Sequence, residues 1–258
     1  MDSKVIVITG ASAGIGAASA RLLGTEGHKL VLAGRREAEL KQVAKESGNQ
    51  AMLIKCDVTI RKEVDSLRDA ALKHFGAIDV WINNAGRGIN KKTIDLSDED
   101  FDEIVRVNLK SALYGMQAII PYFQRQKKGH LINISSFLGR VPFVTFRSIY
   151  SAAKSALNIL TANLRMDLKD LYPDIKVSLV LPGRVSTDFS KNAIGGTPQV
   201  APVGGMMQSQ TAEDVASVIS DVIKNPLAEV YTNPILAEIA ANYYRDVGAF
   251  EDNMRQGK

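Results

Sequence analysis

The segment Thr9-Gly10-Ala11-Ser12-Ala13-Gly14-Ile15-Gly16 decides the expected fold. It follows a short β-branched run that starts at Lys4, and it opens a segment up to Glu26 with apolar residues at helical spacing. The pattern predicts a strand, a tight turn and a helix. Glycines at such a turn let the backbone approach a pyrophosphate, whose charge is favoured by free amides and by the positive end of the helix dipole. Taken alone, the G-x-x-x-G-x-G spacing is also compatible with a plain tight connection.

The same alternation of strand and helix patterns continues along the chain. Strands are predicted at 29–33, 51–55, 78–83, 130–135, 176–181 and 229–232, and helices at 37–47, 61–75, 98–126, 149–171 and 211–224. Strands that alternate with helices imply right-handed crossovers and a parallel sheet covered on both faces. The expected fold is therefore α/β: a doubly wound Rossmann-type parallel sheet of about seven strands, in a single domain over residues 1–258.

Composition narrows the class of protein. The 258 residues are 45% hydrophobic, enough for one full core, and the 32 basic and 28 acidic residues are interleaved. The net charge of +4 therefore indicates a mixed solvated surface and no nucleic-acid partner. No run reaches about 18 apolar residues, so we expect a cytoplasmic protein without an integral membrane segment. One cysteine, Cys56, excludes an internal disulfide, and the three scattered histidines predict no metal site.

The end of the second predicted strand indicates which cofactor is bound. A dinucleotide site usually places an acid there, about 20 residues beyond the glycine turn, to hold a ribose 2′-hydroxyl. This chain instead has Arg35 and Arg36, whose guanidinium groups suit a 2′-phosphate. The sequence therefore predicts NADP(H) rather than NAD(H). The alternative is that both arginines belong to a solvated helix start and pair locally with Glu37 and Glu39.

Tyr150 and Lys154 form a candidate acid–base pair. They are four residues apart at the start of a predicted helix, so they share one helix face. An ammonium close to a phenol lowers a pKa that is otherwise about 10, so Tyr150 could exchange a proton with a carbonyl or alcohol near neutral pH. This spacing also occurs on ordinary helix surfaces. The preceding strand, which ends in Ile134-Ser135-Ser136, is what makes the pair a candidate site.

Three further motifs occur in order, each at a predicted strand or helix end: Cys56-Asp57-Val58, Asn83-Asn84-Ala85-Gly86 and Tyr150-Ser151-Ala152-Ala153-Lys154. With the glycine turn, they make the chain from about Lys4 to Phe189 resemble the short-chain dehydrogenase/reductase family. The resemblance implies an oxidoreductase that transfers hydride between NADP(H) and a small-molecule carbonyl or alcohol substrate. It implies the catalytic residues Asn108, Ser136, Tyr150 and Lys154.

The resemblance also implies roles for these residues and for the cofactor site. Ser136 would orient the substrate oxygen, Lys154 would also hold the nicotinamide ribose, and Asn108 would support a water-mediated proton path. Asp57 would bond the adenine amine, Asn84 would steady the central strand and the adenosine side, and 182–187 would clasp the nicotinamide, with Val185 near the carboxamide and Thr187 near a phosphate. The expected cofactor-binding residues are Gly10, Ser12, Gly14, Ile15, Gly16, Arg35, Arg36, Asp57, Val58, Asn84, Ala85, Gly86, Tyr150, Lys154, Pro182, Gly183, Val185 and Thr187.

The chain departs from the family pattern at the catalytic serine. The commonest family spacing from serine to tyrosine is thirteen, but the residue thirteen before Tyr150 is Phe137, which cannot hydrogen-bond. We therefore expect Ser136, with one extra residue in the loop 139–148, and Ser135 as the alternative.

A second departure is the C-terminal extension, 233–258, which replaces the family's usual Asp-Gly-Gly ending. Its segment 234–247 predicts an amphipathic helix carrying Tyr243 and Tyr244, which would cover the substrate cleft or a subunit contact. The resemblance implies a homodimer or homotetramer, and this departure leaves open which one forms.

The segment 188–210 is rich in glycine, proline and small residues and has no clear period. It predicts a substrate lid with hinges at Gly195-Gly196 and Gly204-Gly205 and apolar contacts from Met206 and Met207, or else an ordinary surface loop.

Substrate identity is the least determined property. By family analogy, Phe137, Leu138, Phe143 and Phe146 would line a pocket for a hydrophobic carbonyl compound, although core packing explains them equally well. The alternative function is a catalytically idle NADP(H)-binding sensor or scaffold. The intact set of Asn108, Ser136, Tyr150 and Lys154 favours the enzyme, because a sensor needs none of these side chains.

Overall fold

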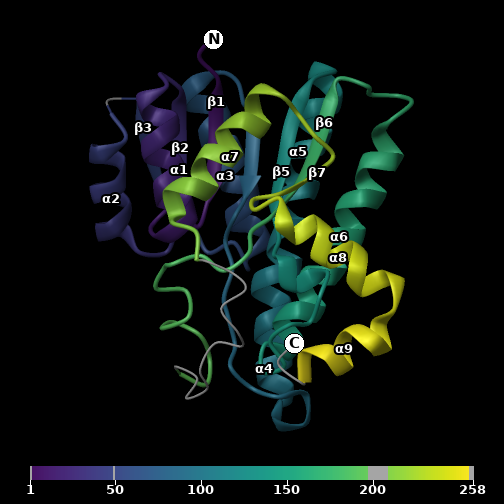
Figure 1. Cartoon of the computed structure of the whole chain (residues 1–258). Helices are drawn as coiled ribbons and strands as arrows, with labels where there is room; N and C mark the ends of the chain where they lie inside the picture. The colour runs from purple at the N-terminus through teal and green to yellow at the C-terminus, as the bar shows by residue number, and fades with distance from the viewer. Residues whose placement is uncertain (1, 49, 197–208, 256–258) are drawn as a thin grey trace.

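The computed structural model describes residues 2–48, 50–196 and 209–255, and it contains one parallel sheet of seven strands (Figure 1). The strands are β1 (Val5–Thr9), β2 (Lys29–Gly34), β3 (Ala51–Lys55), β4 (Val80–Asn83), β5 (Gly129–Ile134), β6 (Ile175–Leu181) and β7 (Glu229–Tyr231). Their order across the sheet is β3-β2-β1-β4-β5-β6-β7. The predicted doubly wound α/β fold is confirmed, and the order reverses between β1 and β4, where such sheets bind ligands.

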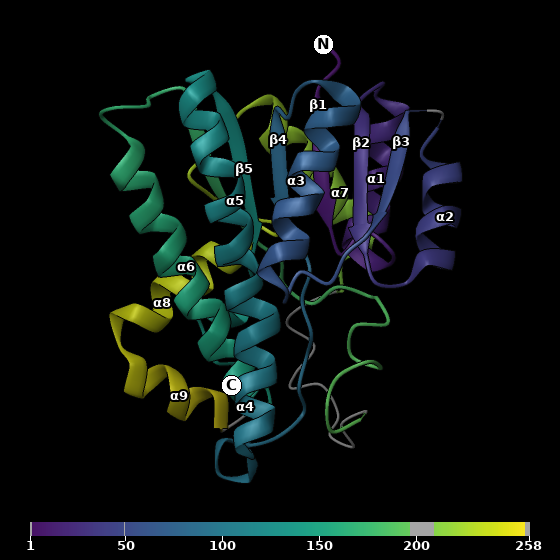
Figure 2. The ribbon, with the colours of Figure 1, turned by 180° about the vertical axis from the view of Figure 1, so that it is seen from behind.

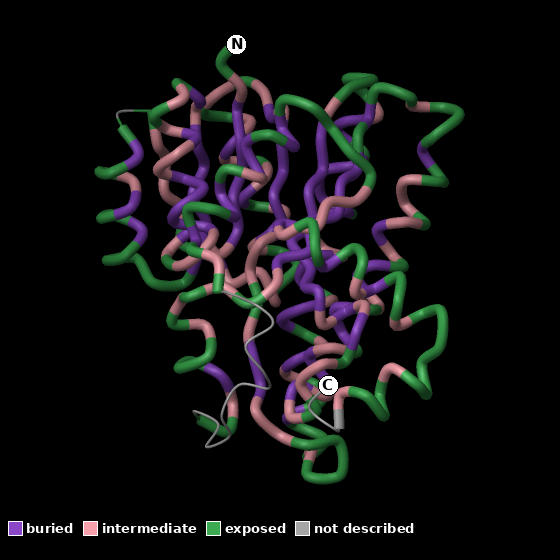
Figure 3. The backbone as a smooth tube through the Cα atoms, in the orientation of Figure 1, coloured by how far each residue is buried: buried purple, intermediate pink, exposed green. Residues whose placement is uncertain are grey.

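Helices cover both faces of the sheet (Figures 1 and 2). One face carries α1 (Gly14–Thr25), α2 (Glu37–Glu46) and α7 (Ala212–Lys224), and the other carries α3 (Arg61–Phe75), α5 (Ser111–Gln126) and α6 (Ser148–Leu168). Successive strand residues point to opposite faces: Ile6 and Ile8 pack toward α1, and Val7 packs toward α3. Because both faces are buried, the strands read as continuous apolar runs, and Figure 3 shows them inside an exposed outer layer.

A buried polar chain holds α6 against the middle of the sheet. Trp81 Nε1 donates to Asn83 Oδ1 at 2.8 Å, and Asn83 Nδ2 donates to Asn133 Oδ1 at 2.9 Å. Asn133 Nδ2 in turn donates to Thr161 Oγ1 on α6 at 2.9 Å. Buried polar groups that satisfy one another in this way specify a single packing arrangement. The chain therefore positions α6, and the candidate pair at its start, relative to β4 and β5.

The predicted single helix over 98–126 is interrupted. The structure has α4 (Asp98–Val105), a π turn at Arg106–Lys110, and then α5. Asn108 lies in this turn, where its Nδ2 donates to the Ile104 carbonyl at 3.0 Å, and the Ser111 amide bonds Arg106 O five residues back. Single π turns inside helices are frequent at functional sites.

The C-terminal extension forms two helices, α8 (Ile235–Arg245) and α9 (Val247–Arg255). The first was predicted; α9 was not, because nine residues carry too few apolar positions to show a period. Short 3₁₀ turns at Thr93–Asp95 and Phe137–Gly139 were also not predicted. Both C-terminal helices lie below the carboxyl edge of the sheet, beside α4 and α6 (Figures 1 and 2).

Within 2–48, 50–196 and 209–255, no helix has the length and apolar character needed to cross a membrane. In the predicted lid, Gly195 and Gly196 have positive φ angles of 85° and 73°. The second hinge, Gly204-Gly205, and the adjacent Met206 and Met207 lie outside the described residues.

Candidate active site

The first turn has a bare backbone held in a conformation that favours glycine. Gly10 and Gly14 have φ angles of 66° and 54°, in the left-handed region. A Cβ added at Gly10 would lie 2.8 Å from Ala85 Cα, and one added at Gly16 would lie 2.4 Å from Gly10 O. The turn therefore packs directly on the segment after β4 and presents main chain at the start of α1, the arrangement that binds a pyrophosphate.

Two other predicted segments meet this turn. Asn84 Nδ2 donates to Thr9 O at 2.9 Å and to Gly10 O at 3.2 Å, which ties the end of β4 to the end of β1. From the segment after β6, the Thr187 methyl lies 3.4 Å from the Cβ position of Gly14. The first turn, Asn84 and Thr187 thus share one site at the carboxyl edge.

Both candidate arginines border the same turn. Arg36 Nη2 donates to Ser12 Oγ at 3.1 Å, and Arg35 Nη1 lies 4.0 Å from Asp57 Oδ2. Local pairing is present as well, because Arg36 Nη1 lies 3.6 Å from Glu39 Oε1. Burial acts to raise the pKa of Asp57, but hydrogen bonds from Thr59 and the charge of Arg35 outweigh it and lower the pKa. Asp57 is therefore an ionised acceptor at neutral pH.

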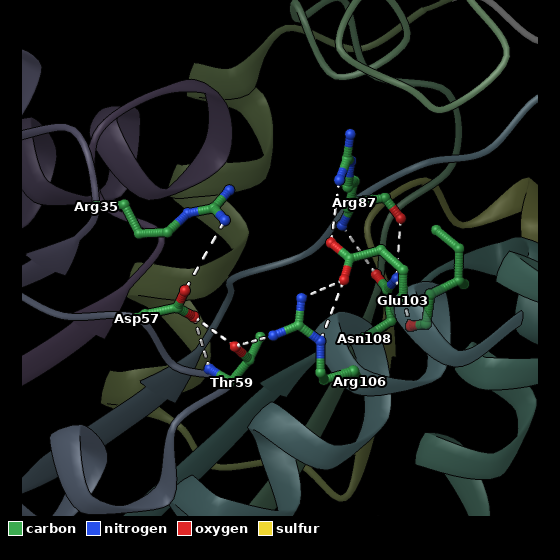
Figure 4. Close-up of polar contacts among 8 residues, drawn as sticks. Arg35, Asp57, Thr59, Arg87, Glu103, Arg106 and Asn108 are labelled. Atoms are coloured by element: carbon green, nitrogen blue, oxygen red, sulfur yellow. Dashed lines mark hydrogen bonds and ion pairs between the residues drawn. The ribbon is translucent and has the colours of Figure 1, made fainter. Parts of the chain in front are cut away.

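A chain of polar contacts connects the end of β2 with the π turn (Figure 4). Thr59 Oγ1 donates to Asp57 Oδ1 at 2.7 Å and accepts from Arg106 Nη1 at 2.6 Å. Glu103 pairs with both Arg106 and Arg87. The complete chain runs through Arg35, Asp57, Thr59, Arg106, Glu103, Arg87 and Asn108. It joins the predicted adenosine side of the site to the predicted catalytic side.

Tyr150 and Lys154 project from the first turns of α6 toward the end of β5. Lys154 Nζ donates to Ile134 O at 2.8 Å and lies 5.8 Å from the centroid of the Tyr150 ring. Ser136 lies close enough to the Tyr150 phenol to act on its pKa, and its Oγ accepts from Leu138 N at 3.2 Å. All three side chains are buried, so the sequence-predicted serine, tyrosine and lysine come together.

Burial dominates the titration of this pair. It lowers the pKa of Lys154 from 10.5 to about 8. It also raises the pKa of Tyr150, and the hydrogen bond with Ser136 and the charge of Arg147 only partly oppose that rise. The expectation that Lys154 lowers the phenol pKa is therefore wrong. The reason is that the ammonium faces the Ile134 carbonyl and that loss of water disfavours both charged forms.

Asn108 completes the group from the π turn. Its Oδ1 accepts from Arg87 N at 3.1 Å, and its Nδ2 donates to Arg87 O at 2.9 Å, so this buried amide is fully hydrogen-bonded. A Cβ added at Gly86 would lie 3.0 Å from Asn108 Oδ1 and 3.8 Å from Lys154 Nζ. Gly86 therefore lies between Asn108 and Lys154 and leaves space that any larger residue would fill.

The geometry separates the two candidate serines. Ser135 Oγ bonds Asn158 Oδ1 and, at 3.3 Å, the Lys154 carbonyl, so it holds α6 on β5. Ser136 is the serine that contacts Tyr150. This placement favours Ser136 and gives Ser135 a packing role.

Other predicted cofactor residues contribute main chain or packing. Ile15, Val58 and Val185 are partly buried against the two cores that flank the sheet. Pro182 O accepts from Phe137 N at 2.8 Å, and a Cβ added at Gly183 would lie 2.9 Å from a Leu236 methyl. Any contact between the segment after β6 and a cofactor would therefore come largely from its backbone.

Two of the four residues predicted to line a substrate pocket pack against the C-terminal helices instead. Phe137 is 1% exposed and packs with Leu236 of α8. The Phe143 ring lies 5.8 Å from the Phe250 ring of α9. These two rings form the contact with the C-terminal extension, whereas Leu138 packs in the cluster that contains Tyr150.

Sequence reasoning missed Arg147 and Phe189. The Arg147 guanidinium lies 5.8 Å from the Phe189 ring centroid, and the Tyr150 ring lies 5.6 Å from the same ring. The only signal was the position of Arg147 three residues before Tyr150, just ahead of the helix start. No such signal marks Phe189, which reaches the site only through the path of the chain after β6.

Fold and site together define a Rossmann-type, nucleotide-binding oxidoreductase. The family model for short chain dehydrogenases matches residues 4–195, and the chain belongs to the short-chain dehydrogenase/reductase family. An uncharacterized oxidoreductase of Staphylococcus epidermidis is 37% identical over 191 residues, which is 74% of this chain and 82% of that protein. One from Staphylococcus aureus strain USA300 is 40% identical over 188 residues, 72% of this chain and 80% of that protein.

Solved structures agree with this assignment. A short-chain dehydrogenase/reductase from Burkholderia phymatum in complex with NAD has a TM-score of 0.86 and 26% identity, covering 96% of this chain and 95% of that one. An F189W actinorhodin polyketide ketoreductase with NADPH has a TM-score of 0.79 and 27% identity, covering 89% and 95%. The chain is thus an oxidoreductase whose structural neighbours bind NAD or NADP(H).

Proposed function

We propose that this protein is an NADP(H)-dependent oxidoreductase that interconverts a carbonyl compound and an alcohol, with Tyr150 as general acid and base. The observation that carries the proposal is the convergence of Asn108, Ser136, Tyr150 and Lys154 beside the bare backbone of the first turn. These residue types at one sheet edge supply a proton donor, an oxygen ligand and a buried cation.

The residues at the first turn fit NADP(H). The left-handed glycines leave main-chain amides free for a pyrophosphate, and Arg36, positioned by Ser12, can pair with a 2′-phosphate alongside Arg35. On the family pattern, Asp57 and Asn84 serve the adenosine side, and Val185 and Thr187 serve the nicotinamide side. When bound, the nicotinamide supplies or accepts the hydride.

The protein side chains manage the oxygen and its proton. In reduction, the Ser136 hydroxyl would hydrogen-bond the substrate carbonyl oxygen, and Tyr150 Oη would donate its proton to that oxygen. Lys154, with a pKa of about 8, keeps its positive charge near neutral pH and, on the family pattern, would hold the nicotinamide ribose. Asn108 would support the path by which the proton is replaced. In oxidation the proton moves in the opposite direction.

Tyr150→Phe tests the proposal. The substitution removes the phenol oxygen and preserves ring packing, so the variant should fold and should still bind NADPH. Turnover of a ketone panel, followed by loss of NADPH absorbance, should fall by about 10²- to 10⁴-fold. The matched control is Tyr122→Phe, which removes a buried phenol on α5 outside the site.

The serines provide a second arm of the same experiment. Ser136→Ala should reduce turnover more than Ser135→Ala, whose effect should appear mainly as lost stability because Ser135 bonds Asn158. Near-normal turnover by Tyr150→Phe on any ketone that the native protein reduces would contradict the mechanism and favour the idle binding protein.

A further inference from the structure

Arg147 is a buried cation that has no anionic partner within the described part of the chain. It is 8% exposed, and its Nη1 has no hydrogen-bond partner among those residues. Its Nη2 donates to Ser190 Oγ at 3.0 Å. A buried charge without a counter-charge is strongly destabilising, so such a group calls for a specific explanation.

Neighbouring carboxylates do not supply that counter-charge. Asp188 pairs with Lys191 at 2.8 Å, and Asp100 pairs with Lys91. The hydroxyl of Ser190 is a neutral acceptor, which balances a guanidinium less well than a carboxylate does. Arginine stays protonated in proteins, so Arg147 keeps its charge despite burial.

The guanidinium lies beside the proposed chemistry. Arg147 immediately precedes α6, three residues before Tyr150, and the positive charge of its guanidinium acts to lower the Tyr150 pKa. Phe189 contacts both side chains. The proposed phosphate ligands, Arg35 and Arg36, are instead at the first turn, so Arg147 is placed for the substrate.

The backbone near Arg147 leaves space for the guanidinium. A Cβ added at Gly88 would lie 2.2 Å from Arg147 Nη1 and 3.2 Å from the Ala193 Cβ. Any residue other than glycine at position 88 would therefore displace the guanidinium. The group is thus packed between Gly88 and the segment that carries Phe189, Ser190 and Ala193.

We propose that Arg147 binds a carboxylate of the substrate, which makes the substrate a short oxo acid or the corresponding hydroxy acid. This inference rests on the proposed function. The carboxylate takes the place of Ser190 Oγ on the guanidinium fork, while the substrate carbonyl faces Tyr150. In reduction the carbonyl carbon gains the hydride of NADPH and its oxygen gains the Tyr150 proton; the carboxylate is unchanged. The guanidinium lies 5.8 Å and the Tyr150 ring 5.6 Å from the centroid of the same Phe189 ring, which limits the two substrate groups to a separation of a few carbon atoms.

Pairs of acids and their uncharged methyl esters test the inference. Pyruvate, acetoacetate and levulinate place the carboxylate at increasing distance from the ketone. For the best acid, kcat/KM with the native protein should exceed that of its ester by about 10- to 150-fold, the range expected for a charge-assisted contact. Arg147→Met should remove this preference, mainly by raising the KM of the acid, so that the acid and its ester are reduced with similar kcat/KM. The matched control is Arg165→Met on the same helix, whose guanidinium bonds Ala228 O at 3.0 Å.

Binding is measured separately, by calorimetric titration of each acid and ester into protein saturated with NADP⁺. The inference predicts that an acid binds more tightly than its ester and that Arg147→Met removes the difference. Equal binding of acids and esters to the native protein would overturn it, even where esters are reduced and the proposed function stands. An equal loss of acid and ester turnover in Arg147→Met would also overturn it, because Arg147 would then act on Tyr150. Acid binding that depends on Arg147, without reduction of any ketone, would support the carboxylate site and refute the proposed function.

Discussion

Arg35 and Arg36 are adjacent in the sequence but differ in their surroundings. Arg36 lies against the first turn through Ser12 Oγ, whereas the Arg35 side chain is 64% exposed and faces Asp57. Both guanidinium groups remain accessible to a ligand at the end of β2. Their position at the end of β2 makes both arginines candidates for binding a 2′-phosphate.

Alanine at either position should change cofactor choice. Each charge-assisted contact to the 2′-phosphate contributes about 1.5–3 kcal/mol, so Arg35→Ala and Arg36→Ala should each weaken NADPH binding by roughly 10- to 150-fold. NADH binding should stay nearly unchanged, because NADH has no 2′-phosphate. Calorimetry measures both, with Arg21→Ala, an exposed α1 arginine paired with Glu46, as control. Tighter binding of NADH than of NADPH by the native protein would refute the assignment.

Among the helices, the C-terminal pair shows most clearly how an element contributes to the site. Leu236 and Ala240 of α8 pack on Phe137 and Val141, in the segment that follows Ser136. Tyr244 Oη also donates to Arg140 O at 3.0 Å. The extension therefore braces the serine segment of its own chain. Its predicted role at a subunit contact stays a prediction.

Leu236→Ala tests this brace. Leu236 is fully buried, so truncation should lower the free energy of unfolding by about 2–5 kcal/mol, measured by urea denaturation. The matched control is Leu227→Ala, at a side chain that is 57% exposed, which should change it by no more than about 0.5 kcal/mol. Similar effects of the two substitutions would show that α8 is not packed as described.

For the whole molecule, the buried Lys154 makes stability depend on pH. Its pKa is about 8 in the folded protein, against 10.5 for the ordinary side chain. Below pH 8 the lysine is protonated in both states, and the folded state bears the full cost of burying the charge. Between pH 8 and 10.5 the unfolded chain binds a proton that the folded protein has lost, so this contribution to stability rises with pH.

Lys154→Met should therefore stabilise the protein while abolishing catalysis. Below pH 8, removing the buried charge should raise the free energy of unfolding of the variant by at most about 3 kcal/mol. Loss of the hydrogen bond to Ile134 O should reduce that gain by about 1 kcal/mol. The gain should shrink as the pH rises through 10.5, above which the lysine of the native protein is neutral in both the folded and the unfolded state. Chemical denaturation at several pH values measures it. A stability difference that does not vary with pH would contradict a buried, charged Lys154.

The sequence by itself determined the sheet and most of the site. The hydrophobic periods of strands and helices depend only on residues close in the sequence, so they can be read without the structure. Their alternation predicts a doubly wound parallel sheet, in which the carboxyl ends of the strands meet at one edge. The glycine turn, Arg35 and Arg36, and the Tyr150–Lys154 pair are each defined by short spacings, and all of them lie at that edge. Ser136 was already expected from the sequence, and the structure favours it over Ser135 because Ser135 bonds Asn158.

Only the tertiary structure decided the features that depend on burial and on distant partners. The π turn carries Asn108, whose side chain bonds both the Ile104 carbonyl and Arg87, twenty-one residues away. The Tyr150 pKa is raised because the surrounding elements exclude water and so disfavour the charged phenolate. No local sequence pattern indicates this burial. Arg147 became a candidate ligand for the same reason: only the packed structure shows that its Nη1 has no hydrogen-bond partner among the described residues.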